Sequence, residues 1–237
     1  MTANDPRVIV ALDYPDKASA MHFVSKVSPD LCRLKVGKGM FTYYGPDFVR
    51  ELTALGFTVF LDLKFHDIPN TVFDACTAAA KLGVWMVNVH ISGGIEMMRA
   101  ARRAIDIPSS KNKPLLIGVT ILTSLDQDDL SSLGIDDSLE DTVLRLARIA
   151  KTAGLDGVVC SAQEAVLLRK NLGDDFLLIT PGIRLSSDDI ADQKRVMTPG
   201  AAFAAGVDYL VMGRSITEAR NPREILLSLQ TRKIVTD

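Results

Sequence analysis

The segment FLDLKFHDIPN, at residues 60–70, concentrates side chains that could carry out acid–base chemistry. Asp62 and Lys64 are two residues apart, so on a β-strand they point the same way, and Asp67 follows where the strand would turn toward a helix. A lysine between carboxylates stays protonated, because nearby negative charge favours its charged form. Such a lysine can deliver a proton to a carbanion, while a fixed carboxylate beside it repels a substrate carboxylate.

Lys35, near the end of an earlier apolar run, is expected to complete a group with two positive and two negative charges. The members of this expected group are Lys35, Asp62, Lys64 and Asp67. One interpretation is a network of salt bridges that only orients strands, since such networks also occur without catalysis. We favour the catalytic interpretation, because burying a charged network costs free energy and needs a compensating reason.

The last two apolar runs carry a possible phosphate site. Gly182 ends the run 176–182 and Arg184 follows it, while Gly213 and Arg214 end the run 208–214. Loops after the last two strands of a barrel often bind phosphate through backbone N–H groups, and arginine adds charge-assisted donors. The alternative is that the glycines only make turns and the arginines are solvated. The polar residues 185–194 are long enough to form a lid over a ligand.

Eight short apolar runs predict the elements that position these residues. The runs are almost continuously apolar, as in parallel strands covered on both faces, and helical patterns lie between them. The expected strands are 7–13, 31–37, 57–63, 84–90, 115–120, 155–161, 176–182 and 208–214. The expected helices are 16–27, 46–55, 69–82, 94–105, 138–152, 162–172, 198–205 and 221–230. Gly56, Gly83, Gly154 and Gly206 each stand where a helix gives way to a strand.

Eight strand–helix units in 237 residues predict an α/β fold, a single-domain (β/α)₈ TIM barrel over residues 1–237. An open doubly wound sheet is the rival fold, but no G-x-G-x-x-G follows the first strand. Trp85 is expected in the core, and His66 and His90 are expected to be structural, hydrogen-bonded histidines. The segment Asp-Gln-Asp-Asp at residues 126–129 is expected to form a solvated loop.

The amino-acid composition excludes several classes of protein. Lys and Arg total 27 and Asp and Glu total 29, and 47% of residues are hydrophobic, so disorder and a generally basic, nucleic-acid-binding surface are excluded. No secretory signal is visible, and no apolar run approaches the roughly 18 residues that span a bilayer. Three scattered cysteines fit a reducing compartment, and no metal site is expected without ligands at metal-binding spacing. We expect a cytoplasmic protein.

Together, several segments resemble orotidine 5′-phosphate decarboxylase of the bacterial kind, in order and over nearly the whole chain. They are VALDY (10–14), RLKVGKGMF (33–41), FLDLKFHDIPNT (60–71), ITPGIR (179–184), DQKRVMTP (192–199) and VMGR (211–214). The D-x-K-x-x-D element at 62–67 is shared with a superfamily that includes sugar-phosphate aldolases and decarboxylases. Its combination with Lys35, Thr71, Gln193 and Arg214 is more specific.

The resemblance implies decarboxylation of orotidine 5′-phosphate to uridine 5′-phosphate (UMP), the last step of de novo pyrimidine synthesis, with no cofactor. It implies that Lys64 donates a proton to C6, that Asp62 opposes the substrate carboxylate and that Lys35 links the network to the ribose. It also implies a homodimer in which Asp67 and Thr71 reach into the neighbouring site. The implied substrate contacts are Asp13 for the ribose, Thr123 with Ser124 for the pyrimidine, and Gln193, Gly213 and Arg214 for the phosphate, while Arg184 begins the closing loop.

Two alternatives stay open at this point. One is a magnesium-dependent sugar-phosphate enzyme of the same superfamily, against which Lys35 argues, because those relatives resemble a pattern with a carboxylate metal ligand near the end of strand two. The other is a non-catalytic barrel that senses a phosphate ligand. Loss of activity with a chelator would favour the first, and ligand binding without product would favour the second.

Overall fold

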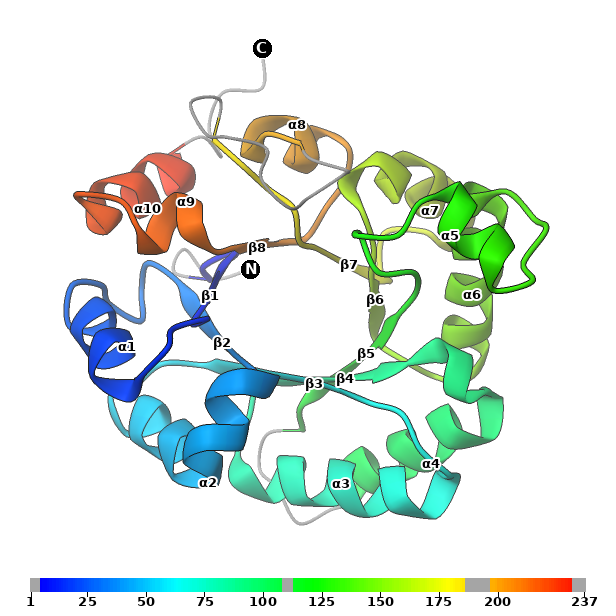
Figure 1. Ribbon diagram of the computed structural model, residues 1–237, viewed down its shortest axis with the longest axis horizontal. Helices are drawn as coiled ribbons and strands as arrows, with labels where there is room; N and C mark the ends of the chain where they lie inside the picture. The colour runs from blue at the N-terminus through cyan, green and yellow to red at the C-terminus, as the bar shows by residue number, and fades with distance from the viewer. Residues whose placement is uncertain (1–4, 108–112, 186–196, 232–237) are drawn as a thin grey trace.

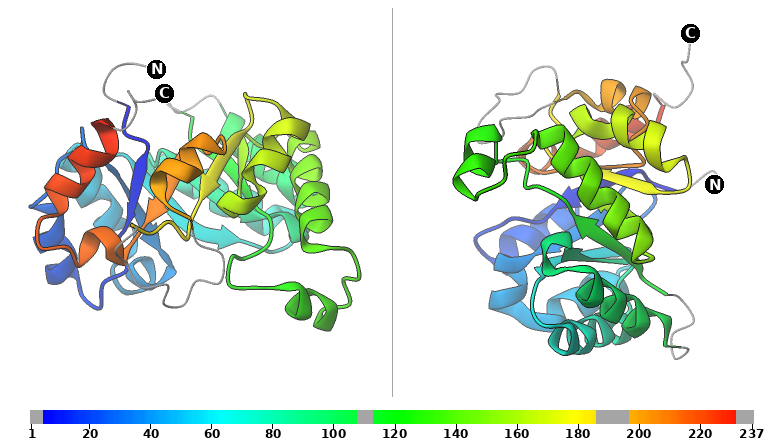
Figure 2. Two further views of the ribbon diagram at one scale, coloured as in Figure 1. Left: turned by 90° about the horizontal axis from the view of Figure 1, so that it is seen from above. Right: turned by 90° about the vertical axis from the view of Figure 1, so that its right-hand side faces the viewer.

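Eight parallel strands close into a barrel in the order β1-β2-β3-β4-β5-β6-β7-β8, as the computed structural model of the chain shows (Figure 1). The structure describes residues 5–107, 113–185 and 197–231. Helices surround the barrel on all sides, and α5 extends beyond the rim at which the strands end (Figure 2). The predicted (β/α)₈ barrel is therefore confirmed.

Each predicted strand and helix has a counterpart. The strands are β1 (Val8–Ala11), β2 (Arg33–Gly37), β3 (Val59–Phe65), β4 (Met86–His90), β5 (Leu115–Val119), β6 (Gly157–Val159), β7 (Leu177–Thr180) and β8 (Tyr209–Met212). The helices are α1 (Lys17–Val24), α2 (Lys38–Ala54), α3 (Pro69–Leu82), α4 (Ile95–Asp106), α5 (Gln127–Ser132), α6 (Leu139–Thr152), α7 (Ala165–Leu172), α8 (Pro199–Ala204), α9 (Arg214–Thr217) and α10 (Pro222–Thr231), with 3₁₀ turns at Ile91–Gly93 and Ala162–Glu164. None of the helices in the described ranges is long and apolar enough to cross a membrane.

Two apolar clusters account for the continuous apolar runs. A small cluster fills the barrel interior, and a larger one lies between the barrel and its helices. Inside the barrel lie Ile9, Ala11, Phe60, Met86, Ile117, Ile179, Tyr209 and Val211, with Trp85 packed against them. Both faces of each strand are thus removed from water, which is why the sequence shows little alternation.

Prolines and glycines set the helix boundaries as predicted. Pro69, Pro199 and Pro222 begin α3, α8 and α10, where the missing N–H would have no helical partner. Gly83 ends α3 with a left-handed φ of 79°, a conformation that costs glycine no Cβ contact. The other three predicted helix-ending glycines, Gly56, Gly154 and Gly206, also have positive φ.

Helix α2 begins earlier than the sequence predicted. The chain turns into helix at Lys38, directly after β2, rather than at residue 46. Gly45, with a φ of 60° and a ψ of −158°, divides this segment into two helices at a kink. Pro46 then restarts the helix, so the predicted boundary is an internal break. Sequence reasoning placed the start at the proline because Gly45-Pro46 is a strong local signal.

The acidic run after β5 is helical rather than a solvated loop, so that expectation was wrong. The Asp126 carboxylate accepts a hydrogen bond from the Asp129 N–H at 3.1 Å, and the Asp129 carboxylate accepts one from the Asp126 N–H at 3.0 Å. This reciprocal capping box satisfies N–H groups at the start of α5. Acidic side chains at this end also complement the helix dipole.

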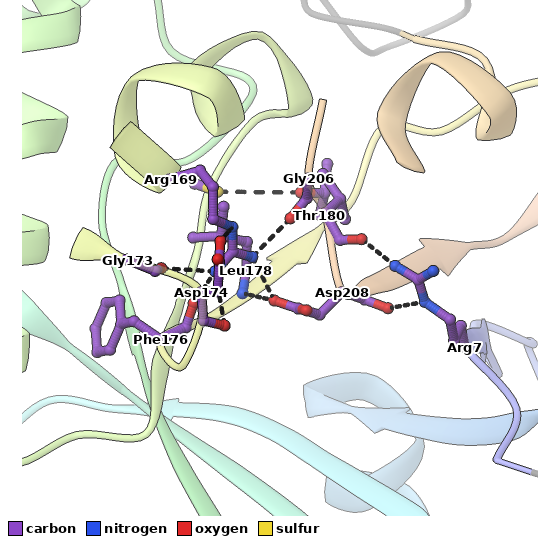
Figure 3. Close-up of polar contacts among 11 residues, drawn as sticks. Arg7, Arg169, Gly173, Asp174, Phe176, Leu178, Thr180, Gly206 and Asp208 are labelled. Atoms are coloured by element: carbon purple, nitrogen blue, oxygen red, sulfur yellow. Dashed lines mark hydrogen bonds and ion pairs between the residues drawn. The ribbon is translucent and has the colours of Figure 1, made fainter. Parts of the chain in front are cut away.

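At the rim where the strands begin, a polar network ties α7 to β7, to the start of β8 and to Arg7, which precedes β1 (Figure 3). Arg169 Nη2 lies 2.7 Å from Asp208 Oδ2, and the same oxygen accepts the Leu178 N–H at 2.8 Å. Arg7 Nε donates to the Asp208 carbonyl oxygen at 2.8 Å. Arg169 also donates to the carbonyl oxygens of Gly173, Asp174, Phe176 and Gly206. These contacts join neighbouring elements at this end of the barrel and stabilise the fold.

Candidate active site

Charged side chains from β2, from β3 and from the segment after β1 meet at the rim where the strands end. Lys35 Nζ lies 3.5 Å from Asp13 Oδ1 and 3.2 Å from Asp62 Oδ2. Lys64 Nζ lies 2.6 Å from the other oxygen of the same carboxylate, Asp62 Oδ1. We call these four residues, Asp13, Lys35, Asp62 and Lys64, the charged row. Their charges alternate, and the parallel register brings the three strand ends to one place.

The middle of the charged row is buried, and its two ends are more exposed. The side chain of Asp62 is 10% exposed and that of Lys64 is 25% exposed, whereas that of Asp13 is 67% exposed. Burial disfavours ionisation of Asp62, but the charges of Lys35 and Lys64 and hydrogen bonds from Lys64 and Asn88 outweigh it. Together they hold the pKa of the Asp62 carboxyl below its ordinary value. The row therefore presents a fixed carboxylate beside an ammonium group in a partly dry site.

Strand β3 is irregular at the lysine of this pair. Lys64 has a φ of 54°, and it is the only residue other than glycine with a positive φ in the described part of the chain. The pairing of β3 with β4 passes from Leu61 opposite Val87 to Phe65 opposite Val89, a register shift. The sequence predicted that Asp62 and Lys64 act on one side of the strand, and their side chains do meet, although the strand between them is not regular.

Asn88 on β4 is a member of the site to which the sequence analysis gave no role. Its Nδ2 donates to Asp62 Oδ1 at 2.7 Å, and its Oδ1 accepts the Lys64 backbone N–H at 2.8 Å. The side chain is fully buried, at 0% exposure. One signal was available, because a polar residue two positions after Met86 in an apolar run faces the same side of the strand as that residue.

Asp67 does not join the charged row of its own chain. Its Oδ1 accepts the N–H of the next residue, Ile68, at 2.7 Å, and within the described residues it forms no ion pair with Lys35 or Lys64. The whole segment 66–71, which includes Thr71, is exposed. The group expected from the sequence therefore forms within one chain with Asp13 in the place of Asp67.

The residues expected at the phosphate lie after β7 and β8, which pair with each other. Gly182 has a φ of 75°, and the Arg184 N–H bonds to the Met197 carbonyl oxygen at 3.2 Å. Gly213 precedes α9, and Arg214 is the exposed first residue of that helix. Gln193 and most of the expected lid, 185–194, lie outside the described residues.

The remaining expected contacts lie near the same rim. Thr123 is buried in the segment that follows β5, and its neighbour Ser124 is exposed.

His66 and His90 pack together, with ring centroids 5.6 Å apart. Burial lowers the pKa of His90 below its ordinary value, and electrostatic repulsion from His66, Lys38 and Lys64 adds to this effect. His90 is therefore neutral at pH 7.

Comparisons with known proteins give a consistent result. The model of the family described as "Orotidine 5′-phosphate decarboxylase / HUMPS family" matches residues 6–228. The chain is 61% identical over 223 residues to the orotidine 5′-phosphate decarboxylase of Vibrio cholerae serotype O1 (strain O395), covering 94% of this chain and 96% of that protein. It is 59% identical over 222 residues to the orotidine 5′-phosphate decarboxylase of Aliivibrio fischeri (strain MJ11), covering 94% of each.

Solved structures agree over the whole barrel. The crystal structure of orotidine 5′-phosphate decarboxylase from Lactobacillus acidophilus matches with a TM-score of 0.87 at 37% identity, covering 98% of this chain and 100% of that chain. The crystal structure of an uncharacterized conserved protein from Geobacillus kaustophilus matches with a TM-score of 0.83 at 41% identity, covering 95% of this chain and 99% of that chain.

Proposed function

The chain belongs to the orotidine 5′-phosphate decarboxylase / HUMPS family, and we propose that its charged row performs the decarboxylation. The chain converts orotidine 5′-phosphate to uridine 5′-phosphate and carbon dioxide, a step of pyrimidine biosynthesis, as the name of relatives at 58–61% identity indicates. The observation that carries the assignment to the charged row is the Lys64–Asp62 pair, with 2.6 Å between Nζ and Oδ1 at the rim where barrel enzymes act.

Lys64 is the proton donor in this proposal. The bond between C6 of the pyrimidine and the carboxylate breaks, carbon dioxide leaves, and the electron pair stays on C6. A proton then passes from the Lys64 ammonium to C6, which leaves a neutral amine that solvent reprotonates. The neighbouring carboxylate of Asp62 holds the ammonium group in place through an ion pair, with 2.6 Å between Lys64 Nζ and Asp62 Oδ1.

Asp62 acts on the bound substrate before the bond breaks. It is buried and held ionised by Lys35 on one oxygen and Lys64 on the other. A substrate carboxylate placed against it is repelled, and the repulsion disappears as neutral carbon dioxide forms. The site therefore favours the transition state over the bound substrate, which raises the chemical rate. Lys35 continues the row to Asp13, the proposed ribose contact.

The phosphate of the substrate provides binding free energy far from the reacting carbon. We assign it to Gly213 and Arg214 after β8, together with Gln193, and we assign Arg184 to the loop that closes over the ligand. Binding free energy at such a remote group can be used to hold the carboxylate against Asp62. Thr123 and Ser124, after β5, are the proposed contacts to the pyrimidine ring.

A homodimer with shared sites is part of the proposal. Asp67 and Thr71 lie on an exposed segment directly after the catalytic strand, and Asp67 is not used by its own charged row. Ile68 between them is also exposed, at 67%, so this segment is accessible to a second subunit. Asp67 and Thr71 would then complete the neighbouring site.

The proposal places the reaction in the cytoplasm and needs no metal or organic cofactor. Free, buried cysteines at positions 32, 76 and 160 fit a reducing compartment. The cationic Lys35 amino group, 3.2 Å from Asp62 Oδ2, opposes the binding of a metal cation to that carboxylate.

A turnover assay tests the function. Purified protein is incubated with orotidine 5′-phosphate, and the loss of orotate absorbance is followed with and without EDTA. We expect full turnover in both samples. No turnover by the folded protein would contradict the assignment, and activity lost with EDTA would favour a metal-dependent sugar-phosphate enzyme. Tight binding with no product would favour a sensor.

A further inference from the structure

Asn88 joins the Asp62 carboxylate to the Lys64 backbone N–H. No other side chain in the described residues joins these two groups. Its amide nitrogen donates to Asp62 Oδ1 at 2.7 Å, and its amide oxygen accepts the Lys64 backbone N–H at 2.8 Å. The orientation of the amide follows from its partners, because a carboxylate can only accept and a backbone N–H can only donate. One rigid planar group therefore sets the distance between the carboxylate and the backbone of the lysine.

The backbone that Asn88 holds is unfavourable for a lysine. A φ of 54° brings Cβ close to the backbone, and L-residues with side chains rarely adopt it without compensation. The ladder between β3 and β4 passes from Leu61 opposite Val87 to Phe65 opposite Val89. The segment around Lys64 therefore lacks the regular hydrogen bonds between β3 and β4. The Asn88 side-chain oxygen accepts the Lys64 N–H instead of a backbone carbonyl oxygen.

Asn88 also acts on the oxygen to which Lys64 binds. Asp62 Oδ1 accepts both the Lys64 ammonium at 2.6 Å and the Asn88 amide at 2.7 Å, while Oδ2 faces Lys35 at 3.2 Å. The two oxygens of Asp62 thus have different partners, and the carboxylate cannot rotate without losing a hydrogen bond from a fully buried residue.

We infer that Asn88 is a positioning residue for the decarboxylation: it holds Lys64 in its left-handed backbone conformation and fixes the rotation of the Asp62 carboxylate. The inference rests on the proposed function of Lys64 and Asp62. Asn88 takes no part in the bond-breaking or the proton transfer. Its effect is on the geometry of the two groups that do, and small errors in such geometry are costly in rate.

A purely structural role for Asn88 makes a different prediction. If it only satisfies buried polar groups, its loss lowers stability and leaves the rate of the folded enzyme unchanged. If it positions Lys64 and Asp62, its loss lowers kcat in the folded enzyme. KM changes little, because the proposed phosphate contacts Gly213 and Arg214 follow β8 and are not on β3 or β4. The change in kcat, compared with the change in KM, therefore distinguishes a positioning role from a purely structural one.

The experiment measures kcat and KM for orotidine 5′-phosphate in the full-length enzyme and in Asn88→Ala and Asn88→Asp. Alanine removes both hydrogen bonds. Aspartate has nearly the same shape and keeps an acceptor for the Lys64 N–H, but it places a second carboxylate against Asp62. Asp208→Asn is the matched control, since it weakens a partly buried polar network at the opposite rim. Thermal unfolding and binding of uridine 5′-phosphate show that each variant is folded.

We expect kcat to fall by about 100-fold in both Asn88 variants, with KM changed by less than about threefold. The control should lose thermal stability and keep its kcat. A kcat within about twofold of wild type in Asn88→Ala, or in Asn88→Asp if the alanine variant does not fold, would overturn the inference. Absence of turnover by the wild-type enzyme would contradict the proposed function instead, so the two failures are distinguishable.

Discussion

Lys35 and Lys64 bind opposite oxygens of one carboxylate, that of Asp62. The Lys35 ammonium lies 3.2 Å from Oδ2 and reaches it from the neighbouring strand, whereas the Lys64 ammonium lies 2.6 Å from Oδ1 and comes from the same strand. The two lysines therefore differ in role although they share a partner. Lys35 is buried and joins the Asp62 carboxylate to the Asp13 carboxylate. Lys64 is the more exposed of the two lysines and is available to a substrate.

Lys64→Ala should abolish turnover, because it removes the proposed proton donor. We expect kcat to fall by up to about 10⁴-fold, with uridine 5′-phosphate still bound. The orotate absorbance assay and a direct binding titration measure the two effects. Lys113→Ala removes an exposed lysine paired with Asp106 and serves as the charge-matched control. Near-normal turnover by Lys64→Ala would show that the donor is a different group.

Mixing two inactive variants should restore activity if subunits share their sites. In a dimer of Lys64→Ala with Asp67→Ala, one site contains both substitutions and the other contains neither. Random exchange makes half of the dimers mixed, so about a quarter of the wild-type activity should return. Subunit exchange is checked with differently tagged chains. If the mixed dimers form and remain inactive, Asp67 does not act in the neighbouring site.

Asp208→Asn should lower stability without lowering kcat. The substitution weakens the bonds from Arg169 Nη2 at 2.7 Å and from the Leu178 N–H at 2.8 Å (Figure 3). Hydrogen bonds to charged groups contribute about 1.5–3 kcal/mol, so a loss of that size is expected in the free energy of unfolding. Denaturant titration gives the value. A fall in kcat with unchanged stability would show that this rim is coupled to the reaction.

The cysteine thiols should be unreactive in the folded protein. Burial raises the pKa of both Cys32 and Cys76 to about 12, and Cys160 is also buried. A thiol reacts as its thiolate, so very little of the reactive form is present near pH 8. Titration with a thiol reagent should detect none of the three in buffer and all three in denaturant. Rapid labelling of native protein would mean that the surrounding helices open readily.

His90 should make the protein less stable in mild acid. Its pKa is below its ordinary value of 6.5, chiefly because of burial, so the unfolded chain takes up the proton first as the pH falls. Stability from this group is present above the unfolded pKa and is lost as the pH falls from there toward the folded pKa. His90→Gln should flatten the decrease in melting temperature between about pH 7 and pH 5. An unchanged slope would assign the acid sensitivity to other groups.

Much of the fold was predictable because its signals are local. The apolar runs, Pro69 at a helix start and Gly83 at a helix end each act within a few residues, and all are confirmed. Helix α2 departs from the prediction because its first half, Lys38 to Tyr44, lacks a capping signal and is defined by its position after β2. The capping box at α5 was present in the sequence as Asp126 and Asp129, but a run of like charge resembles a loop more than a helix start.

For the active site, the sequence by itself determined which charged residues lie at strand ends, because Lys35 and Asp62 stand near the ends of apolar runs and Lys64 follows directly. Only the tertiary structure decided how they meet. It placed Asn88 against both Asp62 and the Lys64 backbone, and it left Asp67 out of its own charged row. The physical reason is that these contacts join different strands or depend on a register shift, and the rotation of each strand in the barrel is set by the packing of the whole interior.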